Sequence, residues 1–401
     1  MSTAQATTRT PTELHLPGAD GETRLHRVGP RSAVFDAAYG GAGVASRSVY
    51  AAGHVVADPL ADPADHGTAA AIDWDATLAF RRHLWDLGLG LAEAMDTAQR
   101  GNGLDWALAR RLIRTSGTEA AARGGRVVAG AMTDQLDPAG TYPVDRLVDA
   151  YLEQIAWIRD SRAEPVVMAS RHLAASATGV DDYVAVYDEV LRQSDGPVFL
   201  HWLGEAFDPA LRGYWGSADL DVAAEVVLGL IRDHEPKVAG IKISLLDAER
   251  EIDLRRRLPE SVLMHTGDDF NYVELIRGDE HGHSHALLGI FDAIAAPARA
   301  ALDRLDAGDA DGFSAILEPT VPLARHLFAA PTSAYKTGVV FLAWLNGHQD
   351  HFRMVAGAEL QRSVPHLARV FALADEGGAL ADPELATFRM RQFLAVAGVS
   401  P

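Results

Sequence analysis

Short apolar segments alternate with amphipathic helical patterns along most of this chain, from about residue 49 to residue 294. Eight segments predict strands, at 49–58, 87–95, 126–134, 165–173, 197–203, 237–244, 261–269 and 285–294. Helical patterns separate them, at 73–88, 105–117, 143–161, 180–194 and 220–234. Eight strands that alternate with helices over about 250 residues predict a closed (β/α)8 TIM barrel. We favour this α/β barrel over an open doubly wound sheet because no G-x-G-x-x-G motif follows the first segment.

Two flanking regions extend the predicted barrel. The sequence ELHLPGADGETRLHRV predicts a β-hairpin within an N-terminal extension of residues 1–48. The barrel itself is expected to span residues 49–295. Beyond it the pattern is helical only, which predicts a C-terminal helical region over residues 296–401.

The composition excludes several classes of function. The chain has 401 residues and a net charge of -19, and this acidity disfavours nucleic acid and membrane partners because both bind clustered cations. No cysteine is present, which excludes disulfides and thiolate nucleophiles. The first residues, MSTAQATTRTPTELH, lack the apolar core of a signal peptide. We therefore expect a cytoplasmic protein.

Lysine is rare here, and one lysine interrupts an apolar strand segment. Of the 36 Lys and Arg residues, only Lys237, Lys242 and Lys336 are lysine. Strand alternation predicts that Lys242 points into the barrel near the carboxyl end of its strand, where barrel active sites lie. The predicted inner face also holds Val238, Gly240 and Ser244, and the outer face holds Ala239, Ile241, Ile243 and Leu245.

An inward-facing ammonium has two interpretations. Its desolvation is costly unless it forms an ion pair or loses its proton. As a neutral amine, Lys242 would attack a carbonyl carbon to form a Schiff base. As an ion pair it would be structural, but arginine usually serves that purpose. We interpret Lys242 as the nucleophile, because this chain otherwise uses arginine almost throughout.

The segments around Lys242 resemble the dihydrodipicolinate synthase and N-acetylneuraminate lyase superfamily. VAGIKIS is similar to that family's strand six, which ends in the Schiff-base lysine; VLMHTGDDFNYVELIRG resembles strand seven and GPVFLHWLG strand five. The helices after residue 296, with Lys336, resemble its C-terminal region. The resemblance covers about residues 50 to 345. It implies a divergent class I aldolase or lyase that needs no cofactor besides its lysine and assembles as a homodimer or homotetramer.

Two departures from the family pattern bear on the chemistry. The family's strand five ends in Tyr-Asn, and its tyrosine transfers protons; this chain has His201 and Trp202 there. We expect His201 to transfer protons, since a histidine titrates near neutral pH. The family's Gly-Thr-Thr-Gly-Glu loop holds the carboxylate of pyruvate. Here residues 96–100 read DTAQR, in which only Thr97 matches and Asp96 adds a negative charge, which argues against pyruvate as substrate or product.

Polar side chains follow most of the predicted strands. The residues expected to contact substrate are Asp58, Asp96, Thr97, Gln99, Asp134, His172, Trp202, Ser244, His265, Asp268, Asp269 and Asp292. Some of these acids would serve equally well as helix caps. Together they predict a mouth rich in hydrogen-bond acceptors, which suits a polyhydroxylated carbonyl compound derived from a carbohydrate.

The sequence therefore predicts a lyase, aldolase or dehydratase that works through a Schiff base on Lys242. One alternative is a sugar isomerase or epimerase that uses the same acids and histidines to bind a divalent metal. Another is a catalytically inactive barrel retained for binding. The DEHGHSH run at 279–285 is expected to be a solvated loop before the last strand, not a metal site.

Overall fold

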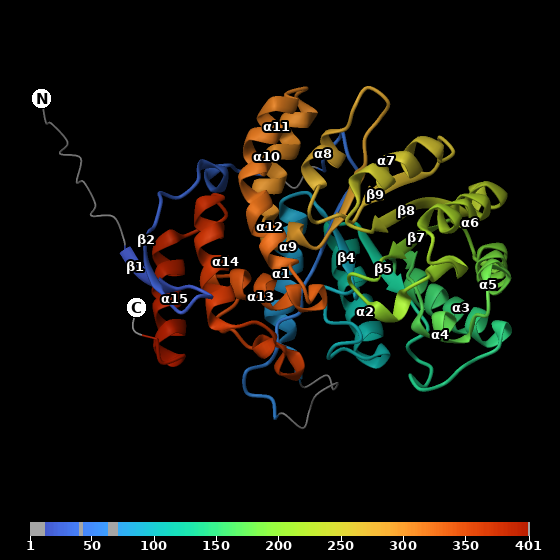
Figure 1. Cartoon of the computed structure of the whole chain (residues 1–401), viewed down its shortest axis with the longest axis horizontal. Coiled ribbons are helices and arrows are strands. Elements are labelled where there is room, and N and C mark those ends of the chain that lie inside the picture. The colour runs from blue at the N-terminus through green and yellow to red at the C-terminus, as the bar shows by residue number, and fades with distance from the viewer. Residues whose placement is uncertain (1–12, 40–42, 63–70, 400–401) are drawn as a thin grey trace, which may run out of the picture.

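Eight parallel strands form a closed barrel at the centre of the molecule, in the order β10-β3-β4-β5-β6-β7-β8-β9. A computed structural model of the chain shows this arrangement and describes residues 13–39, 43–62 and 71–399 (Figure 1). The strands are β3 (Val49–Ala52), β4 (Gly90–Glu93), β5 (Val127–Ala131), β6 (Glu164–Val167), β7 (Val198–Leu203), β8 (Val238–Ser244), β9 (Leu263–Thr266) and β10 (His285–Leu288). The predicted TIM barrel is confirmed.

Helices surround the barrel in the order expected for successive βα units. Those that follow the strands are α1 (Trp74–Asp86), α2 (Trp106–Arg123), α3 (Val144–Asp160), α4 (Arg171–Ser176), α5 (Val180–Gln193), α6 (Leu220–Asp233), α7 (Ala248–Arg257), α8 (Tyr272–Arg277), α9 (Ile290–Ala293) and α10 (Ala295–Asp306). Asp73 and Asp105 cap α1 and α2 by accepting hydrogen bonds from Ala76 N and Leu108 N, which satisfies backbone donors that have no partner within the helix.

The strands are shorter than the apolar segments that predict them. The first segment spans 49–58, but β3 ends at Ala52, and Gly53 to Ala57 are buried without belonging to the strand. Here Val56 N donates a hydrogen bond to Thr77 Oγ1 of α1 at 3.0 Å. An apolar segment indicates that its residues are buried. Here the buried residues continue past Ala52, where β3 ends.

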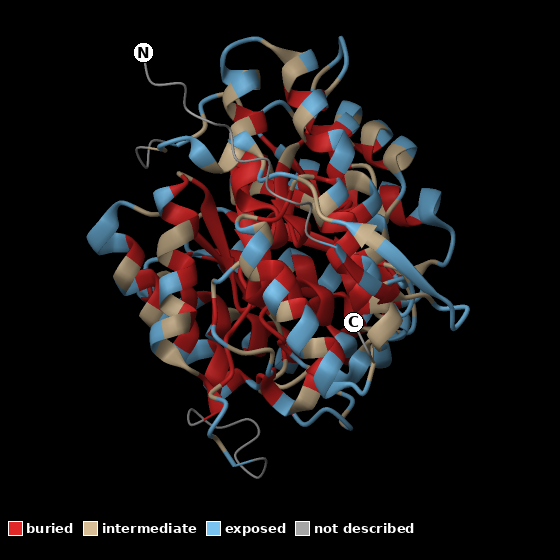
Figure 2. Ribbon diagram, turned by 90° about the vertical axis from the view of Figure 1, so that its left-hand side faces the viewer, coloured by how far each residue is buried: buried red, intermediate tan, exposed pale blue. Residues whose placement is uncertain are grey.

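The apolar core has two main parts, which Figure 2 shows as buried ribbon through the centre of the molecule. The larger part packs the outer faces of the strands against the helices. The smaller part fills the inside of the barrel and consists of Tyr50, Ala52, Ala92, Met95, Val128, Val166, Met168, Phe199 and Leu287. A filled interior leaves only the ends of the strands for a binding site.

A bulge at the start of β8 corrects one detail of the predicted alternation. Val198 pairs with Val238, but the next residue, Phe199, pairs with Gly240, so Ala239 is an extra residue in the ladder. As a result Val238 packs in the outer core and Ala239 contacts the interior cluster, the reverse of the prediction. From Gly240 onward the pairing is regular, and Ile241 and Ile243 lie in the outer core as expected.

The hairpin and the C-terminal helices pack against one another beside the barrel. The hairpin is β1 (Glu13–Pro17) with β2 (Thr23–Arg27), and the helices are α11 (Ala310–Leu317), α12 (Val321–Leu327), α13 (Tyr335–Leu345), α14 (Val364–Glu376) and α15 (Pro383–Val396). Figure 1 shows the hairpin in blue beside α14 and α15 in red. His26 of β2 bonds to Asp375 of α14 at 2.8 Å. Both predicted flanking regions are confirmed as structural elements.

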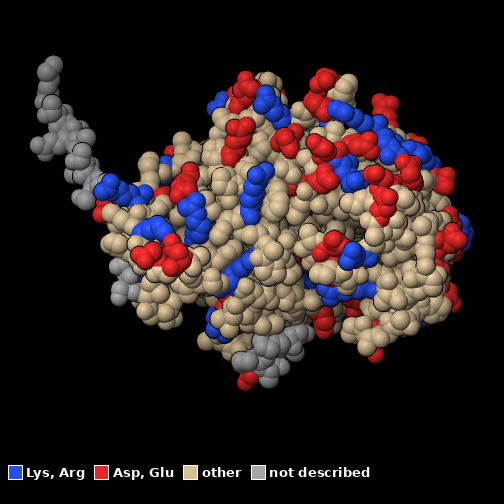
Figure 3. All heavy atoms as spheres, in the orientation of Figure 1, with Lys and Arg blue, Asp and Glu red and all other residues tan. Residues whose placement is uncertain are grey.

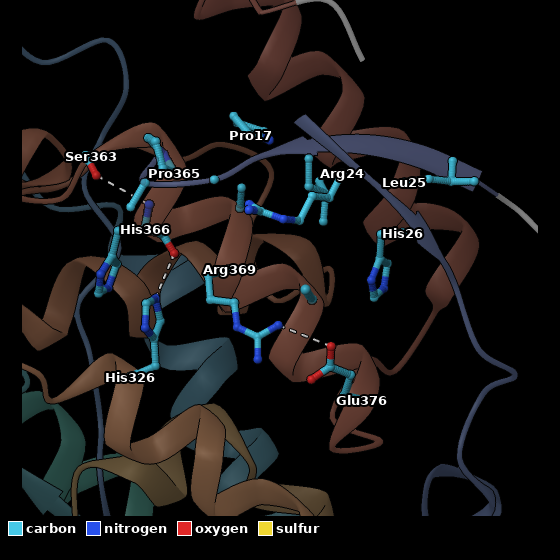
Figure 4. Close-up of a pocket in the computed structure, with 15 residues that line it drawn as sticks. Pro17, Arg24, Leu25, His26, His326, Ser363, Pro365, His366, Arg369 and Glu376 are labelled. Atoms are coloured by element: carbon cyan, nitrogen blue, oxygen red, sulfur yellow. Dashed lines mark hydrogen bonds and ion pairs between the residues drawn. The ribbon is translucent and has the colours of Figure 1, made fainter. Parts of the chain in front are cut away.

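A groove of about 670 Å³ lies between the hairpin and helices α12 and α14 (Figure 4). The rings of His326 and His366 stack there with centroids 4.0 Å apart, and Arg369 pairs with Glu376 at 3.2 Å. No barrel strand contributes any of the described residues that line this groove. It is therefore separate from the barrel mouth.

Charged side chains of both signs lie next to one another over α6 and α7, at the upper right of Figure 3. Arg257 and Arg250 of α7 pair with Glu225 and Asp221 of α6. Within the described part of the chain, no helix is both long enough and apolar enough to cross a membrane.

Candidate active site at the carboxyl ends of the strands

A narrow cavity lies at the carboxyl ends of the barrel strands. The residues that line it are Ala52, Met95, Asp96, Thr97, Met168, His201, Leu203, Phe207, Lys242, Ser244, Asp269, Gly289 and Tyr335. Its free volume is about 20 Å³, enough for one water-sized group. A substrate larger than a few atoms therefore has to displace side chains of this wall.

Lys242 points into this cavity from β8. It lies in register between His201 of β7 and His265 of β9. A Cβ atom at position 267 would overlap Lys242 Cε and Ser244 Oγ, so Gly267 provides the space for both side chains. Among the described residues, Lys242 has no hydrogen-bond or ion-pair partner for its amine. Burial lowers the pKa of Lys242 to about 8, although the nearby carboxylates of Asp269 and Asp96 oppose this shift.

Asp269 faces Lys242 from the loop after β9. Its Oδ1 accepts a hydrogen bond from Ile290 N, at the start of α9, at 2.8 Å. Burial raises the pKa of Asp269 to about 7 despite that hydrogen bond and the nearby Lys242. This carboxyl group can therefore gain or lose a proton near neutral pH.

His201 and Ser244 form a second polar pair in the wall. His201 Nε2 lies 3.1 Å from Ser244 Oγ, and His201 Nδ1 is buried with no partner among the described residues. Burial first, and then the positive charge of Lys242, hold the pKa of His201 well below its usual range. The imidazole is therefore neutral at physiological pH and can accept or donate a proton according to its tautomer.

The C-terminal region also contributes to the site. Tyr335, the first residue of α13, lies with its hydroxyl 2.6 Å from Thr97 Oγ1, and its ring stacks on Phe328 at 4.2 Å between centroids. Burial raises the pKa of Tyr335 well above its usual value, so the phenol stays protonated. The next residue, Lys336, places its Nζ 2.9 Å from Asp96 Oδ1. Sequence reasoning missed Tyr335, although the lysine beside it in a buried apolar helix was a usable signal.

Comparison with known proteins identifies a family for this chain. The family model described as protein of unknown function (DUF993) matches residues 14–399. The chain belongs to this family. It is also similar to 4-hydroxy-tetrahydrodipicolinate synthase of Alcanivorax borkumensis, with 26% identity over 60% of this chain and 82% of the relative. The dihydrodipicolinate synthase and N-acetylneuraminate lyase superfamily predicted from the sequence is confirmed.

Solved structures share the fold of this DUF993 chain. Dihydrodipicolinate synthase from Thermotoga maritima matches with a TM-score of 0.61 and 14% identity, over 83% of this chain and 99% of its own. A prophage protein of the dihydrodipicolinic acid synthase family from E. coli K12, solved in complex with pyruvate, matches with a TM-score of 0.61 and 12% identity, over 88% and 99% of the two chains. At this identity the likeness concerns the fold alone.

Six of the fourteen residues predicted for the site line the cavity of the DUF993 chain: Lys242, His201, Asp96, Thr97, Ser244 and Asp269. The structure places the other eight elsewhere: Asp58, Gln99, Asp134, His172, Trp202, His265, Asp268 and Asp292. For two of these residues, the position in the strand explains why they do not line the cavity. Trp202 follows the inward His201 and so faces the helices, where it packs near Trp215. His265 points into the barrel but packs between Tyr50 and Phe199 in the interior cluster, not at the cavity.

The remaining six of these residues have structural partners. Two acids cap their own loops, because Asp58 Oδ1 accepts from Leu60 N and Asp268 Oδ1 from Asn271 N. The others tie loops together: Gln99 donates to Val355 O at 2.9 Å, Asp134 pairs with Arg100 at 2.6 Å, His172 bonds to Thr133 at 2.8 Å and Asp292 pairs with His54 at 2.9 Å. Capping and loop bonding account for these side chains without a ligand.

Of the histidines of 279–285, His281 and His283 lie in the predicted loop before β10, whereas His285 is the first residue of the strand. His281 is exposed with its ring 3.5 Å from Glu280, and His283 and His285 lie 5.3 Å apart between ring centroids. In the described portion of this chain, no group of three or more His, Asp or Glu side chains is placed to hold a metal ion.

Proposed function

We propose that this protein is a lyase or aldolase, or a dehydratase, that forms a Schiff base between Lys242 and a small keto compound. The observation that carries the proposal is the amine of Lys242, which points into the cavity, has no partner among the described residues and has a pKa lowered to about 8. At pH 7 such an amine is roughly one-tenth neutral, against about one part in 3,000 for an ordinary lysine. The general reaction type agrees with the superfamily to which the barrel belongs.

The reaction would begin with attack of the neutral Lys242 amine on the carbonyl carbon. The new N–C bond sends the carbonyl electrons to oxygen, which takes up a proton; a second protonation then releases that oxygen as water and leaves an iminium ion. The iminium accepts electrons from the neighbouring bond, so a C–C bond can break or a proton can leave. It performs this electron-accepting function without a metal.

Three groups around Lys242 suit these proton transfers. Tyr335 stays protonated and can donate to the departing oxygen, and its partner Thr97 can resupply the proton through the 2.6 Å contact. Asp269 has a pKa raised to about 7 and can take the proton that the amine loses. Neutral His201 can remove a proton from the carbon next to the iminium. These assignments give Tyr335, Asp269 and His201 one proton transfer each.

The cavity supports a small, hydroxylated substrate. Asp96, Thr97 and Ser244 present oxygen atoms to it, which would accept hydrogen bonds from hydroxyl groups. Because the free volume of about 20 Å³ holds only a water-sized group, a carbohydrate-derived carbonyl compound of a few carbon atoms would displace fewer side chains of the wall than a long sugar. We further propose a cytoplasmic enzyme that assembles as a homodimer or homotetramer.

The test is intact-mass measurement after borohydride reduction in the presence of ketoses, sugar acids and 2-oxo acids. A reduced Schiff base adds the mass of the substrate less one oxygen atom, and peptide mapping should place it on Lys242. Turnover of a substrate found in this way should persist in EDTA. Loss of activity in EDTA with recovery in Mn²⁺ or Zn²⁺ would favour the isomerase alternative. Tight binding with neither trapping nor turnover would favour an inactive binding barrel.

A further inference from the structure

The charges around the cavity are unevenly distributed. Among the described residues that line it, Asp96 and Asp269 are acidic, and Lys242 carries the only cationic side chain. His201 is neutral because its pKa lies well below the usual range. Lys242 must itself lose its charge to act as a nucleophile. When the amine is ready to react, the wall therefore offers no free cation to an anionic group on the substrate.

Asp96 is held in the wall by a counter-ion behind it. The side chain of Asp96 is 35% exposed, whereas that of its partner Lys336 is 2% exposed, and the two are joined at 2.9 Å. The Lys336 ammonium also donates to Ser333 O at 2.9 Å. Lys336 is absent from the cavity lining, so it acts on the cavity only through Asp96. This ion pair holds the Asp96 side chain in the wall, within electrostatic reach of the Lys242 amine.

We propose that the Asp96 carboxylate in the cavity wall repels carboxylate groups, so that the site selects carbonyl compounds that have no carboxylate beside the carbonyl. This inference rests on the proposed Schiff-base function and assigns its substrate class. An incoming carboxylate would meet the like charge of Asp96, and its natural partner, Lys336, is already neutralised. An uncharged hydroxymethyl group would instead donate a hydrogen bond to Asp96.

Two small ketones provide a matched pair of probes. Hydroxyacetone and pyruvate differ only in carrying a hydroxymethyl or a carboxylate group beside the same acetyl unit. Each would be incubated with the full-length protein and cyanoborohydride, and labelling of Lys242 would be followed by intact mass and peptide mapping. Rates would be divided by those of a free lysine derivative, which corrects for the different intrinsic reactivity of the two ketones. We expect the corrected rate for hydroxyacetone to exceed that for pyruvate at least about tenfold.

The variant Asp96→Ala should reverse this preference. Removing the carboxylate leaves space beside Lys336, so the carboxylate of pyruvate can replace that of Asp96. We expect the pyruvate-to-hydroxyacetone ratio to rise at least about tenfold. The matched control is the double variant Asp96→Ala with Lys336→Met, which has the same space but no cation and should lose this gain. Far-UV circular dichroism would check folding, and the preference of the unmodified protein tests the proposal even if a variant does not fold.

The outcomes separate this inference from the proposed function. Labelling of Lys242 by both ketones at equal corrected rates, or faster by pyruvate, would overturn the charge selection and leave the Schiff base intact. An equal gain for both ketones in Asp96→Ala would also overturn it, because the effect would then be one of space. Labelling of Lys242 by neither ketone in the unmodified protein would overturn the proposed function, and this inference with it.

Discussion

The carboxyl end of β8 and the amino end of α13 each hold a lysine beside the same cavity, but the two lysines have opposite surroundings. Lys336 lies within 2.9 Å of both Asp96 Oδ1 and Ser333 O. Lys242 lies near the carboxylates of Asp96 and Asp269 but is bonded to neither, and its pKa falls to about 8. The ammonium of Lys336 is therefore ion-paired, whereas that of Lys242 has no such partner among the described residues and loses its proton more readily.

This difference shows how the fold assigns two uses to one residue type. A partner at ion-pair distance offsets the desolvation of a buried ammonium and fixes it as a charge, which here joins α13 to the loop after β4. Without such a partner, burial favours the neutral amine, and only lysine can then act as a nucleophile, since a guanidinium stays protonated. The contrast between Lys242 and Lys336 is therefore the main evidence for chemistry at this site.

Replacement of Lys242 by arginine tests the contrast between the two lysines most directly. Lys242→Arg keeps the cation and most of the volume but removes the nucleophilic amine. We expect both Lys242→Arg and Lys242→Ala to fold and to lose turnover at least about 1,000-fold, measured on the substrate identified by trapping. Lys237→Arg is the control, because Lys237 donates to Ser194 O at 2.6 Å and is not among the described residues that line the cavity. Near-normal turnover of Lys242→Arg would mean that Lys242 acts as a charge, like Lys336.

The second prediction concerns stability at Lys336. Lys336→Met preserves an unbranched apolar stem but leaves Asp96 without its counter-ion. We expect the free energy of unfolding to fall by about 2 kcal/mol, less than for a fully buried pair because Asp96 is 35% exposed. Chemical denaturation would measure it.

A double-mutant cycle with Asp96→Asn sharpens this second prediction. The double variant Asp96→Asn with Lys336→Met has no unpaired charge, so it should regain more than half of the lost stability. Losses that simply add in the double variant would show that the two side chains do not interact, and the contrast with Lys242 would then disappear.

The barrel could be predicted from the sequence because each strand and each helix has a recognisable pattern within its own residues. Each strand is an apolar segment of its own, and the helices and turns between them repeat one pattern, so the order of elements needs no knowledge of distant contacts. The same local rule placed Lys242, His201 and Ser244 on the inner faces of β7 and β8. It was wrong for Val238 and Ala239 because a single extra residue reverses the alternation on one side of a bulge.

The rest of the site depends on contacts that no local pattern records. Tyr335 meets Thr97 across 238 positions of the chain, and Lys336 reaches Asp96 from the same helix. In contrast, Asp134 and Asp292 have the appearance of site residues in the sequence, yet each has a buried partner that lies far along the chain. A carboxylate at a strand end can bind substrate, cap a helix or pair with an arginine, and only the fold decides among these.

The smallest expected effect is a change in the pH dependence of Lys242. Because burial lowers its pKa to about 8, the neutral fraction rises with pH up to about 8 and levels off above it, so labelling by hydroxyacetone and cyanoborohydride should do the same. The carboxylate of Asp269 raises the pKa of Lys242, and Asp269→Asn removes that charge. The midpoint should therefore move to lower pH, with labelling about two- to threefold faster at pH 7.5, where Asp269 with its pKa of about 7 is mostly ionised in the unmodified protein.

Asp268→Asn is the matched control for this profile, since Asp268 accepts hydrogen bonds from Phe270 N and Asn271 N in the loop before α8 and does not line the cavity. Its amide oxygen can keep the bond from Asn271 N, so the midpoint should stay where it is in the unmodified protein. Lys336 is ion-paired with Asp96 and does not line the cavity, so hydroxyacetone should not label it. A midpoint that rises in Asp269→Asn, or one near that of free lysine in the unmodified protein, would mean that burial does not activate Lys242 and that the two lysines differ in position only.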